Sequence, residues 1–358
     1  VARAAGQGQG QGSMTFRKSL WFAGLAAALA LPAAVPAQEP DLSKLPAAQN
    51  GFKPKATEWG EPDFTGGWPI DSLNGRTPLQ RDAKFGTRQL LTDAEFAERN
   101  AMVTKLENRY QDESSQNKLG IGHWAEVGPA NRRTSWITSP ADGRLPAYTD
   151  EGKRRSAAMH STWRRNQDFD WTSDFDSWDR CVTRGLPASM FPFMYNNGIR
   201  IFQSPGLVAI QLEMIHETRI IPTDGKTAIP RAIHQWLGES RGHWENGNTL
   251  VVETTNFKPG PSATNIGTTG SPPENDTPVS ADARMTERFT MNGPNSIAYE
   301  MTWTDPVVFT APWSARLDWQ RDDKYGIFEY ACTEGDVQIR NYISASRAER
   351  AQKRGSSQ

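Results

Sequence analysis

One stretch of the chain gathers side chains that could carry acid–base chemistry. Glu213 and His216 are three residues apart, and Arg219 and Asp224 follow in the same segment. A carboxylate beside a histidine can exchange protons near neutral pH when the pair is partly buried, as general acid–base catalysis requires. Arg219 could hold an anionic group through its two-pronged guanidinium. The same residues also suit an Arg–Glu cross-strand pair and a histidine at a turn, so both interpretations stand.

The alternation along residues 207–216 predicts where Glu213 points. Val208, Ile210, Leu212 and Met214 share one apolar face, so Glu213 on the other face is expected to look into solvent or a barrel lumen. Glu329 lies between Phe328 and Tyr330, so in a strand it would point away from their aromatic face. We expect it to face the same site as Glu213. The catalytic candidates are therefore Glu213, His216, Asp224 and Glu329.

A second group of residues suits ligand binding, because it combines aromatic rings with hydrogen-bonding groups. For several of these residues a structural role is the alternative: a turn at Tyr195 and Asn197, a corner at Trp244, and a turn cap at Asp305. The ligand-binding candidates are Tyr195, Asn197, Arg219, Arg241, Trp244, Asp305 and Trp313.

Other familiar site patterns do not occur. The five histidines form no His-x-His or His-Glu-x-x-His pattern, which leaves His216 and His234 with a carboxylate as the one metal alternative. The sequence contains no Gly-x-Ser-x-Gly, no P-loop and no dinucleotide fingerprint. We therefore expect no metal and no cofactor. Paired carboxylates with aromatic platforms leave a sugar-cleaving activity open.

The elements that must position these residues follow a period of two from Gly198 onward. Asn246-Gly247 is the preferred pair for a tight hairpin, because both residues tolerate positive φ. Short strands between turn signals predict a mainly β fold, an antiparallel barrel or sandwich with a partly helical, irregular N-terminal region. The expected strands are 200–203, 207–215, 218–222, 234–244, 249–255, 287–291, 296–304, 315–321 and 327–333.

The region before these strands predicts a short strand at 63–68 and two helices. Thr92 and Glu95 have the spacing of a capping box, which predicts a helix from there to about Tyr110. A second helix is expected at 149–165, within a long irregular excursion over 111–179. The stretch 258–283 is rich in Pro, Gly, Ser and Thr, and predicts a long loop that could act as a lid.

The N-terminus predicts export. A basic start at Met14–Lys18 precedes an apolar run of about a dozen residues, and Val35 and Ala37 occupy the small-residue positions of a signal-peptidase site. We expect cleavage after Ala37, and a periplasmic or secreted mature protein with no membrane span. Cys181 and Cys332 then predict one disulfide in an oxidising compartment, with two buried thiols as the alternative.

These signals divide the chain into five parts. Residues 1–13 are an extension, 14–37 a signal peptide, 38–180 an N-terminal part packed on the barrel, 181–345 the antiparallel β domain and 346–358 a polar tail. Residues 38–358 carry 37 basic and 41 acidic side chains, a net charge of −4, which gives no electrostatic footprint for nucleic acid. Oligomeric state is not predicted.

Several motifs occur together along the chain: Arg180–Pro187, Glu213–His216 with Arg219–Ile221, Gly238–Glu245, Thr249–Phe257, Glu287–Phe289, Asp305-Pro306, Pro312-Trp313 and Glu329–Cys332. Together they resemble a large family of secreted bacterial proteins with no assigned reaction. The resemblance covers most of the mature chain and implies no particular activity. The Gly-x-Trp near residue 68 also resembles the opening of lipocalin-like barrels. The chain has Asn-Gly-Asn at 246–248 where the family often has Gly-Asp, and either suits a tight turn.

Three functions remain open from the sequence. The first is an exported protein that binds a small, partly apolar or aromatic molecule in a β-barrel pocket. The second is a cofactor-free hydrolase, lyase or isomerase that uses a carboxylate/His pair in that pocket. The third is a structural envelope protein.

Overall fold

The computed structural model describes residues 41–355 apart from 124, 163, 165, 260–276 and 335–336. The expected signal peptide and extension, and most of the expected lid, lie outside the described residues. The described residues form one compact unit. No helix among the described residues is long and apolar enough to cross a membrane.

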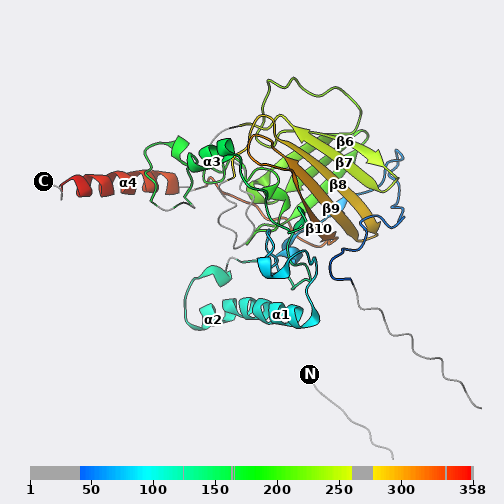
Figure 1. Cartoon of the computed structure of the whole chain (residues 1–358), viewed down its shortest axis with the longest axis horizontal. Coiled ribbons are helices and arrows are strands. Elements are labelled where there is room, and N and C mark those ends of the chain that lie inside the picture. Colours follow the sequence, from blue (N-terminus) through cyan, green and yellow to red (C-terminus); the bar gives the residue numbers. More distant parts are fainter. Residues whose placement is uncertain are drawn as a thin grey trace, which may run out of the picture. The chain divides into compact units, whose positions relative to one another are not determined.

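Two antiparallel sheets make up the centre of this unit. The four-stranded sheet has the order β1 (Gly66–Gly67), β3 (Ile199–Ser204), β4 (Leu207–Leu212) and β5 (Thr218–Pro222). The six-stranded sheet has the order β2 (Ile137–Ser139), β10 (Trp313–Gln320), β9 (Ser296–Thr304), β8 (Arg284–Gly293), β7 (Thr249–Thr255) and β6 (Glu239–Glu245). Figure 1 shows β6 to β10 as neighbouring arrows in that order.

The prediction of a mainly β, antiparallel fold is confirmed; its two sheets are compatible with a sandwich, and the described residues form no closed barrel. The strands at the free edges, β5 and β6, carry no ladder between them in the described residues. Between the sheets the expected alternation is realised, since Ile297, Tyr299, Met301 and Trp303 of β9 are all buried. Aromatic side chains fill this core, which explains the high tryptophan content. Among the described residues five tryptophans are fully buried: Trp68, Trp136, Trp303, Trp313 and Trp319.

Local signals correctly predict two helix starts and a hairpin. Thr92 and Glu95 form the capping box of α1 (Asp93–Glu107), which a short α2 (Arg109–Ser115) follows. Thr149 caps α3 (Asp150–Ala157), which is shorter than expected. Asn246 and Gly247, with φ of 53° and 70°, form the turn between β6 and β7.

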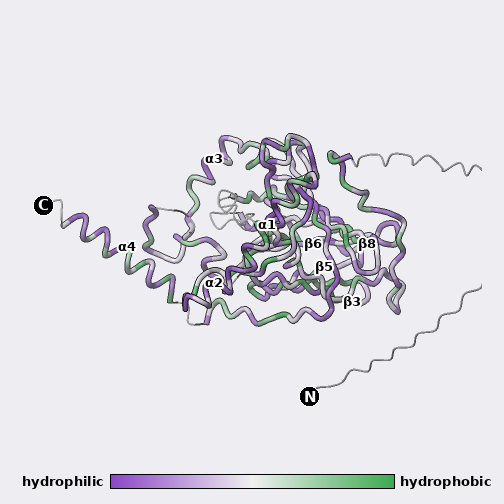
Figure 2. Tube along the Cα trace, turned by 90° about the horizontal axis from the view of Figure 1, so that it is seen from below, coloured by the Kyte–Doolittle hydropathy of each residue, from purple (hydrophilic) through white to green (hydrophobic). Residues whose placement is uncertain are grey.

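The C-terminal part differs from expectation in two places. Residues 327–333 form no strand; they are irregular because hydrogen bonds and a disulfide, described below, tie them to other segments. The expected polar tail belongs to a helix, α4 (Gln338–Gly355), along which hydrophilic residues predominate in Figure 2. Its Ser346 hydroxyl accepts from the Phe169 backbone N–H, so α4 packs against the segment around residue 170.

Candidate functional site

The guanidinium of Arg219 does hold an anionic group, but that group is the carboxylate of Glu287. Arg219 on β5 and Glu287 on β8 have side chains that are 1% and 0% exposed. The Arg219 Nη1 donates to Glu287 Oε1 at 2.9 Å, and Nη2 donates to Glu287 Oε2 and to the Ser240 hydroxyl. The Tyr299 hydroxyl donates to Glu287 Oε1 at 2.9 Å. A buried ion pair therefore links the edge strand β5 of one sheet to the interior strand β8 of the other.

Glu213 is buried rather than directed at solvent or a lumen. The strand β4 ends at Leu212, and Glu213 has helical φ and ψ of −67° and −46°, so the alternation stops there. Its carboxylate accepts from the Gly198 N–H at 2.8 Å, the Tyr325 hydroxyl at 2.9 Å and the Phe328 N–H at 3.0 Å. Gly198 is required by this approach, because a Cβ there would lie 2.5 Å from the carboxylate. Glu213 thus ties residues 325–328 to the end of β4.

The other catalytic candidates do not meet Glu213. Glu329 is exposed, although its neighbour Phe328 contacts the Glu213 carboxylate through its backbone. His216 is exposed in the turn that follows β4. Asp224 forms an exposed ion pair with Lys226 at 2.7 Å, and this pairing holds the pKa of Asp224 below its usual range. The three carboxylates and the histidine therefore share no cavity among the described residues.

Three ligand-binding candidates have structural surroundings. Trp313 is buried in the core between the sheets, and Trp244 packs against Phe64 with ring centroids 5.3 Å apart. Asp305 is also buried, and its carboxylate accepts from the Ser280 hydroxyl at 2.7 Å and from the Val307 and Val308 N–H groups.

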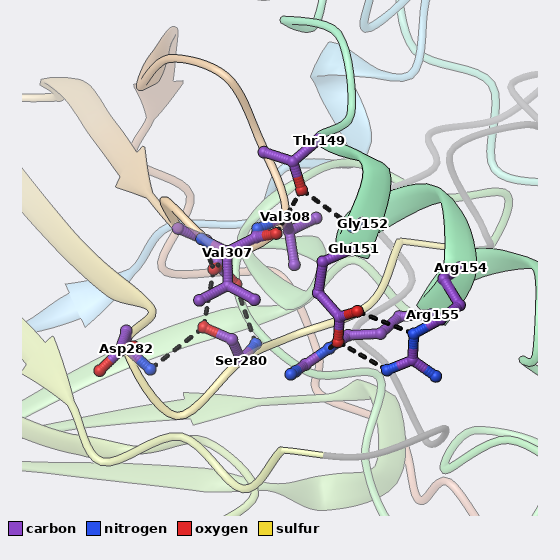
Figure 3. Close-up of polar contacts among 10 residues, drawn as sticks. Thr149, Glu151, Gly152, Arg154, Arg155, Ser280, Asp282, Val307 and Val308 are labelled. Carbon is purple, nitrogen blue, oxygen red and sulfur yellow. Dashed lines mark hydrogen bonds and ion pairs between the residues drawn. The ribbon is translucent and has the colours of Figure 1, made fainter.

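Figure 3 shows the surroundings of these turn contacts. Ser280, Val307 and Val308 lie next to Thr149, the N-cap of α3. The Thr149 hydroxyl donates to the Val307 carbonyl and accepts from the Gly152 N–H. The alternative of a turn cap at Asp305 therefore agrees with the contacts this residue makes.

Asn197 belongs to a small polar cluster under the 196–198 segment. Its Nδ2 donates to Glu126 Oε2 at 2.7 Å and to the Phe193 carbonyl at 2.8 Å. Burial raises the pKa of Glu126. Asn197 and Glu213 border a void of only about 10 Å³, which is about the space one water needs and too little for a ligand.

The disulfide between Cys181 and Cys332 is present, as predicted, with Cα atoms 5.8 Å apart. It joins residues 151 positions apart and is typical of proteins outside the cytoplasm. Beside it is a cavity of about 530 Å³. We call this the disulfide cavity. Both cysteines, four aromatic residues and several polar residues line it: Thr162, Trp178, Asp179, Cys181, Tyr195, Tyr330, Cys332, Val337, Gln338, Asn341 and Tyr342.

A second, smaller core lies beside this cavity and shares aromatic residues with its lining. Trp178, Phe193, Met214 and Ile215 are buried together, and Tyr195 and Tyr330 pack against them. Ile215 reaches this core from a strained turn, with φ of 59°, which is rare for a β-branched residue. Glu213 lies in the same turn. One segment therefore supplies both the carboxylate that holds residues 325–328 and two side chains of the small core.

Arg184 lies beneath the aromatic residues of this region. Its guanidinium carbon is 4.6 Å from the centre of the Phe193 ring and 5.8 Å from that of Trp178. Burial lowers the pKa of Arg184 to about 9 and raises that of Tyr195 to about 12. At neutral pH both groups keep their ordinary charge, so the cavity has a cation behind its rings.

Several residues of this region escaped the sequence interpretation. Trp178 and Tyr342 lie in segments without clear periodicity, and no local signal indicates that they share a cavity with Tyr195. Glu217 accepts from the Thr183 hydroxyl at 2.8 Å, and burial raises its pKa to about 7. A hint in the sequence was Tyr330, which lies two residues before Cys332.

Arg241, the remaining candidate, pairs with Glu239 at 2.6 Å. It lines a different cavity, between β5 and β6, together with Arg219. The described residues contain no group of three or more His, Cys, Asp or Glu side chains that could hold a metal ion. No family model matches the chain, and no curated protein and no solved structure matches it either.

Proposed function

We propose that this protein is exported and binds a small, partly apolar or aromatic molecule in the disulfide cavity. The observation that carries the proposal is the lining itself, in which Trp178, Tyr195, Tyr330 and Tyr342 surround about 530 Å³. Binding pockets for small molecules usually have 300–1,000 Å³ and combine aromatic walls with a few polar groups.

The polar side chains of the lining support recognition of a molecule with hydrogen-bonding groups at its edge. Gln338 and Asn341 bring amides from α4, and Asp179 brings a carboxylate. The Asp179 carboxylate already accepts from the Thr162 hydroxyl and N–H, so it is held in place on the wall. Apolar ring faces with fixed polar atoms favour a flat ligand with a polar rim.

The test is a ligand screen on the oxidised protein by thermal shift, because a ligand that binds only the folded state raises the unfolding temperature. Neutral aromatic compounds, indole and phenyl glycosides among them, are the first set. Hits are then titrated calorimetrically against Tyr330→Ala and, as a matched control, Tyr110→Ala. Tyr110 is 48% exposed and does not line the cavity.

The expected result is a loss of affinity of about tenfold or more in Tyr330→Ala and none in Tyr110→Ala, since a stacked ring contributes on the order of 1–3 kcal/mol. Reduction of Cys181–Cys332 removes the covalent link in the cavity wall and should weaken the same ligands. Equal affinities in the two tyrosine variants would remove the cavity from consideration.

One observation favours the enzyme as a second candidate. A carboxylate with a pKa near 7 is suited to general acid–base catalysis at neutral pH, and Glu217 has that property. In this alternative Glu217 replaces Glu213 and His216 as the acid–base group. Loss of turnover with unchanged ligand affinity in Glu217→Gln would support catalysis, and unchanged turnover would exclude this role.

A further inference from the structure

A second cavity lies where the two sheets approach each other without pairing. We call it the seam cavity. It has about 620 Å³ and lies between β5 and β6 and the segment 229–238. The two strands are close at one end, because a Cβ on Gly242 would lie 3.0 Å from the Ile221 side chain. Thr218 and Gly238 line the cavity toward the other end.

Part of the wall of the seam cavity is apolar, beside polar residues such as Gln235 and Ser240. Ile220 is 54% exposed on the wall from β5, and Trp236 and Leu237 come from the segment before β6. An exposed isoleucine beside a half-buried tryptophan costs free energy in water, and an apolar body covering both would relieve that cost. Pro222 and Ile229 extend the same surface.

The charges around the cavity are positive in balance. Glu239 is compensated by Arg241, and its carboxylate also accepts from the Ile229 N–H. Arg219 is compensated by Glu287. The Nζ of Lys258 lies 4.3 Å from the centre of the Trp236 ring, and Lys258 has no carboxylate partner among the described residues.

The floor adds an unused hydrogen-bond donor. Arg219 lines the cavity, and its two terminal nitrogens are engaged by Glu287 and Ser240. Its Nε is buried without a hydrogen-bond partner among the described residues. A buried donor without an acceptor is costly, and an acceptor on a ligand would remove that cost.

We infer that the seam cavity is a second binding site, which takes a carboxylate carried on a flat apolar body. The apolar body covers Ile220 and stacks on Trp236, while the carboxylate lies toward Lys258 and the Arg219 Nε. The inference depends on other residues than the disulfide cavity and does not rest on the function proposed there.

The probe for this site is 2-naphthoate, with 2-naphthamide as a neutral molecule of the same shape. Both are titrated calorimetrically into the oxidised full chain at low and high salt. Trp236→Ala is compared with Trp171→Ala, since Trp171 is 68% exposed and does not line the cavity. Lys258→Gln is compared with Lys324→Gln, which makes the same charge change at an exposed position outside the cavity. Tyr330→Ala reports on the disulfide cavity.

The expected result is one naphthoate per chain, bound about fivefold or more tightly than the amide. Trp236→Ala should weaken naphthoate about tenfold, because it removes the stacking surface. Lys258→Gln should weaken it about threefold at low salt and less at high salt, since a partly exposed charge is screened. Trp171→Ala, Lys324→Gln and Tyr330→Ala should leave it unchanged.

Four results would overturn the inference. They are the absence of naphthoate binding, equal affinity for the acid and the amide, equal effects in a test variant and its control, and a loss of binding in Tyr330→Ala. The last result would move the carboxylate ligand to the disulfide cavity without affecting the function proposed there.

Discussion

The buried pair of Arg219 and Glu287 allows a quantitative test of how the two sheets are joined. Both side chains are at most 1% exposed, and the contact is bidentate, with the Tyr299 hydroxyl as a further donor to Glu287. Removing one partner leaves an uncompensated charge in the core, which costs about 3–5 kcal/mol. Arg219→Met and Glu287→Gln should each lower the free energy of unfolding by that amount.

The double variant separates the pair from its surroundings. Arg219→Met with Glu287→Gln removes both charges, while the amide oxygen at position 287 still accepts from Tyr299. Because no charge is left unpaired, the double variant should be more stable than either single variant, by roughly 2 kcal/mol or more. For a domain of this size each kcal/mol corresponds to about 2–4 °C in Tm, so the single variants should melt roughly 6–20 °C lower.

The assay is thermal and urea unfolding of the oxidised protein, analysed as a double-mutant cycle. The control is Arg154→Met, which breaks the pair of Arg154 with Glu151 seen in Figure 3. Those side chains are 70% and 37% exposed, so this change should cost at most about 1 kcal/mol. The reasoning fails if Arg219→Met costs no more than Arg154→Met, or if the two single effects add in the double variant.

Three further predictions concern stability. Burial raises the pKa of Glu217 from 4.5 to about 7, so the folded state binds the extra proton and loses stability as the pH rises from about 4.5 to 7. The loss is at most about 3 kcal/mol. Glu217→Gln should show no such loss. The free energy of unfolding of the variant, relative to that of the wild type, should therefore rise between pH 5 and pH 8 in urea unfolding; parallel pH profiles would contradict this. The double variant Cys181→Ser with Cys332→Ser removes the disulfide between residues 151 positions apart. Its free energy of unfolding should fall by up to about 4–5 kcal/mol, which lowers the urea midpoint. An unchanged urea midpoint would show that the disulfide does not stabilise the fold. Thr92→Ala removes the capping box of α1 and should cost about 1 kcal/mol, whereas Thr92→Ser should cost little.

Local patterns in the sequence were enough to predict many of the strands, helix starts and turns of the fold. The strand-like runs predicted β3, β5, β7 and β9 nearly to the residue, and in β5 and β9 the alternation reflects one buried face of the strand. The caps at Thr92 and Thr149 and the turn at Asn246-Gly247 depend on neighbours within three residues. The strand expected at 327–333 was wrong because the contacts that hold this segment come from distant residues.

The site depended on such distant contacts throughout. Glu213 was predicted as a catalytic group from its neighbours, yet its donors Tyr325 and Phe328 lie 112 and 115 positions away. The acidic partner of Arg219 lies 68 positions away. No spacing rule connects these residues, because sheet pairing and the disulfide bring them together. Residue type therefore indicated which groups could do chemistry, and the packing of the sheets decided which of them are already paired.

The sequence by itself determined the strand periodicity, the caps, the hairpin turn and the two cysteines available for a disulfide. Each of these depends on residue type and short-range geometry, which are written directly into the chain. Only the tertiary structure decided that Arg219 is paired within the core and that Glu213 acts as a tether. It also decided that Tyr195 shares a cavity with Tyr342, because Cys181–Cys332 and the packing of α4 bring the C-terminal segment to the middle of the chain.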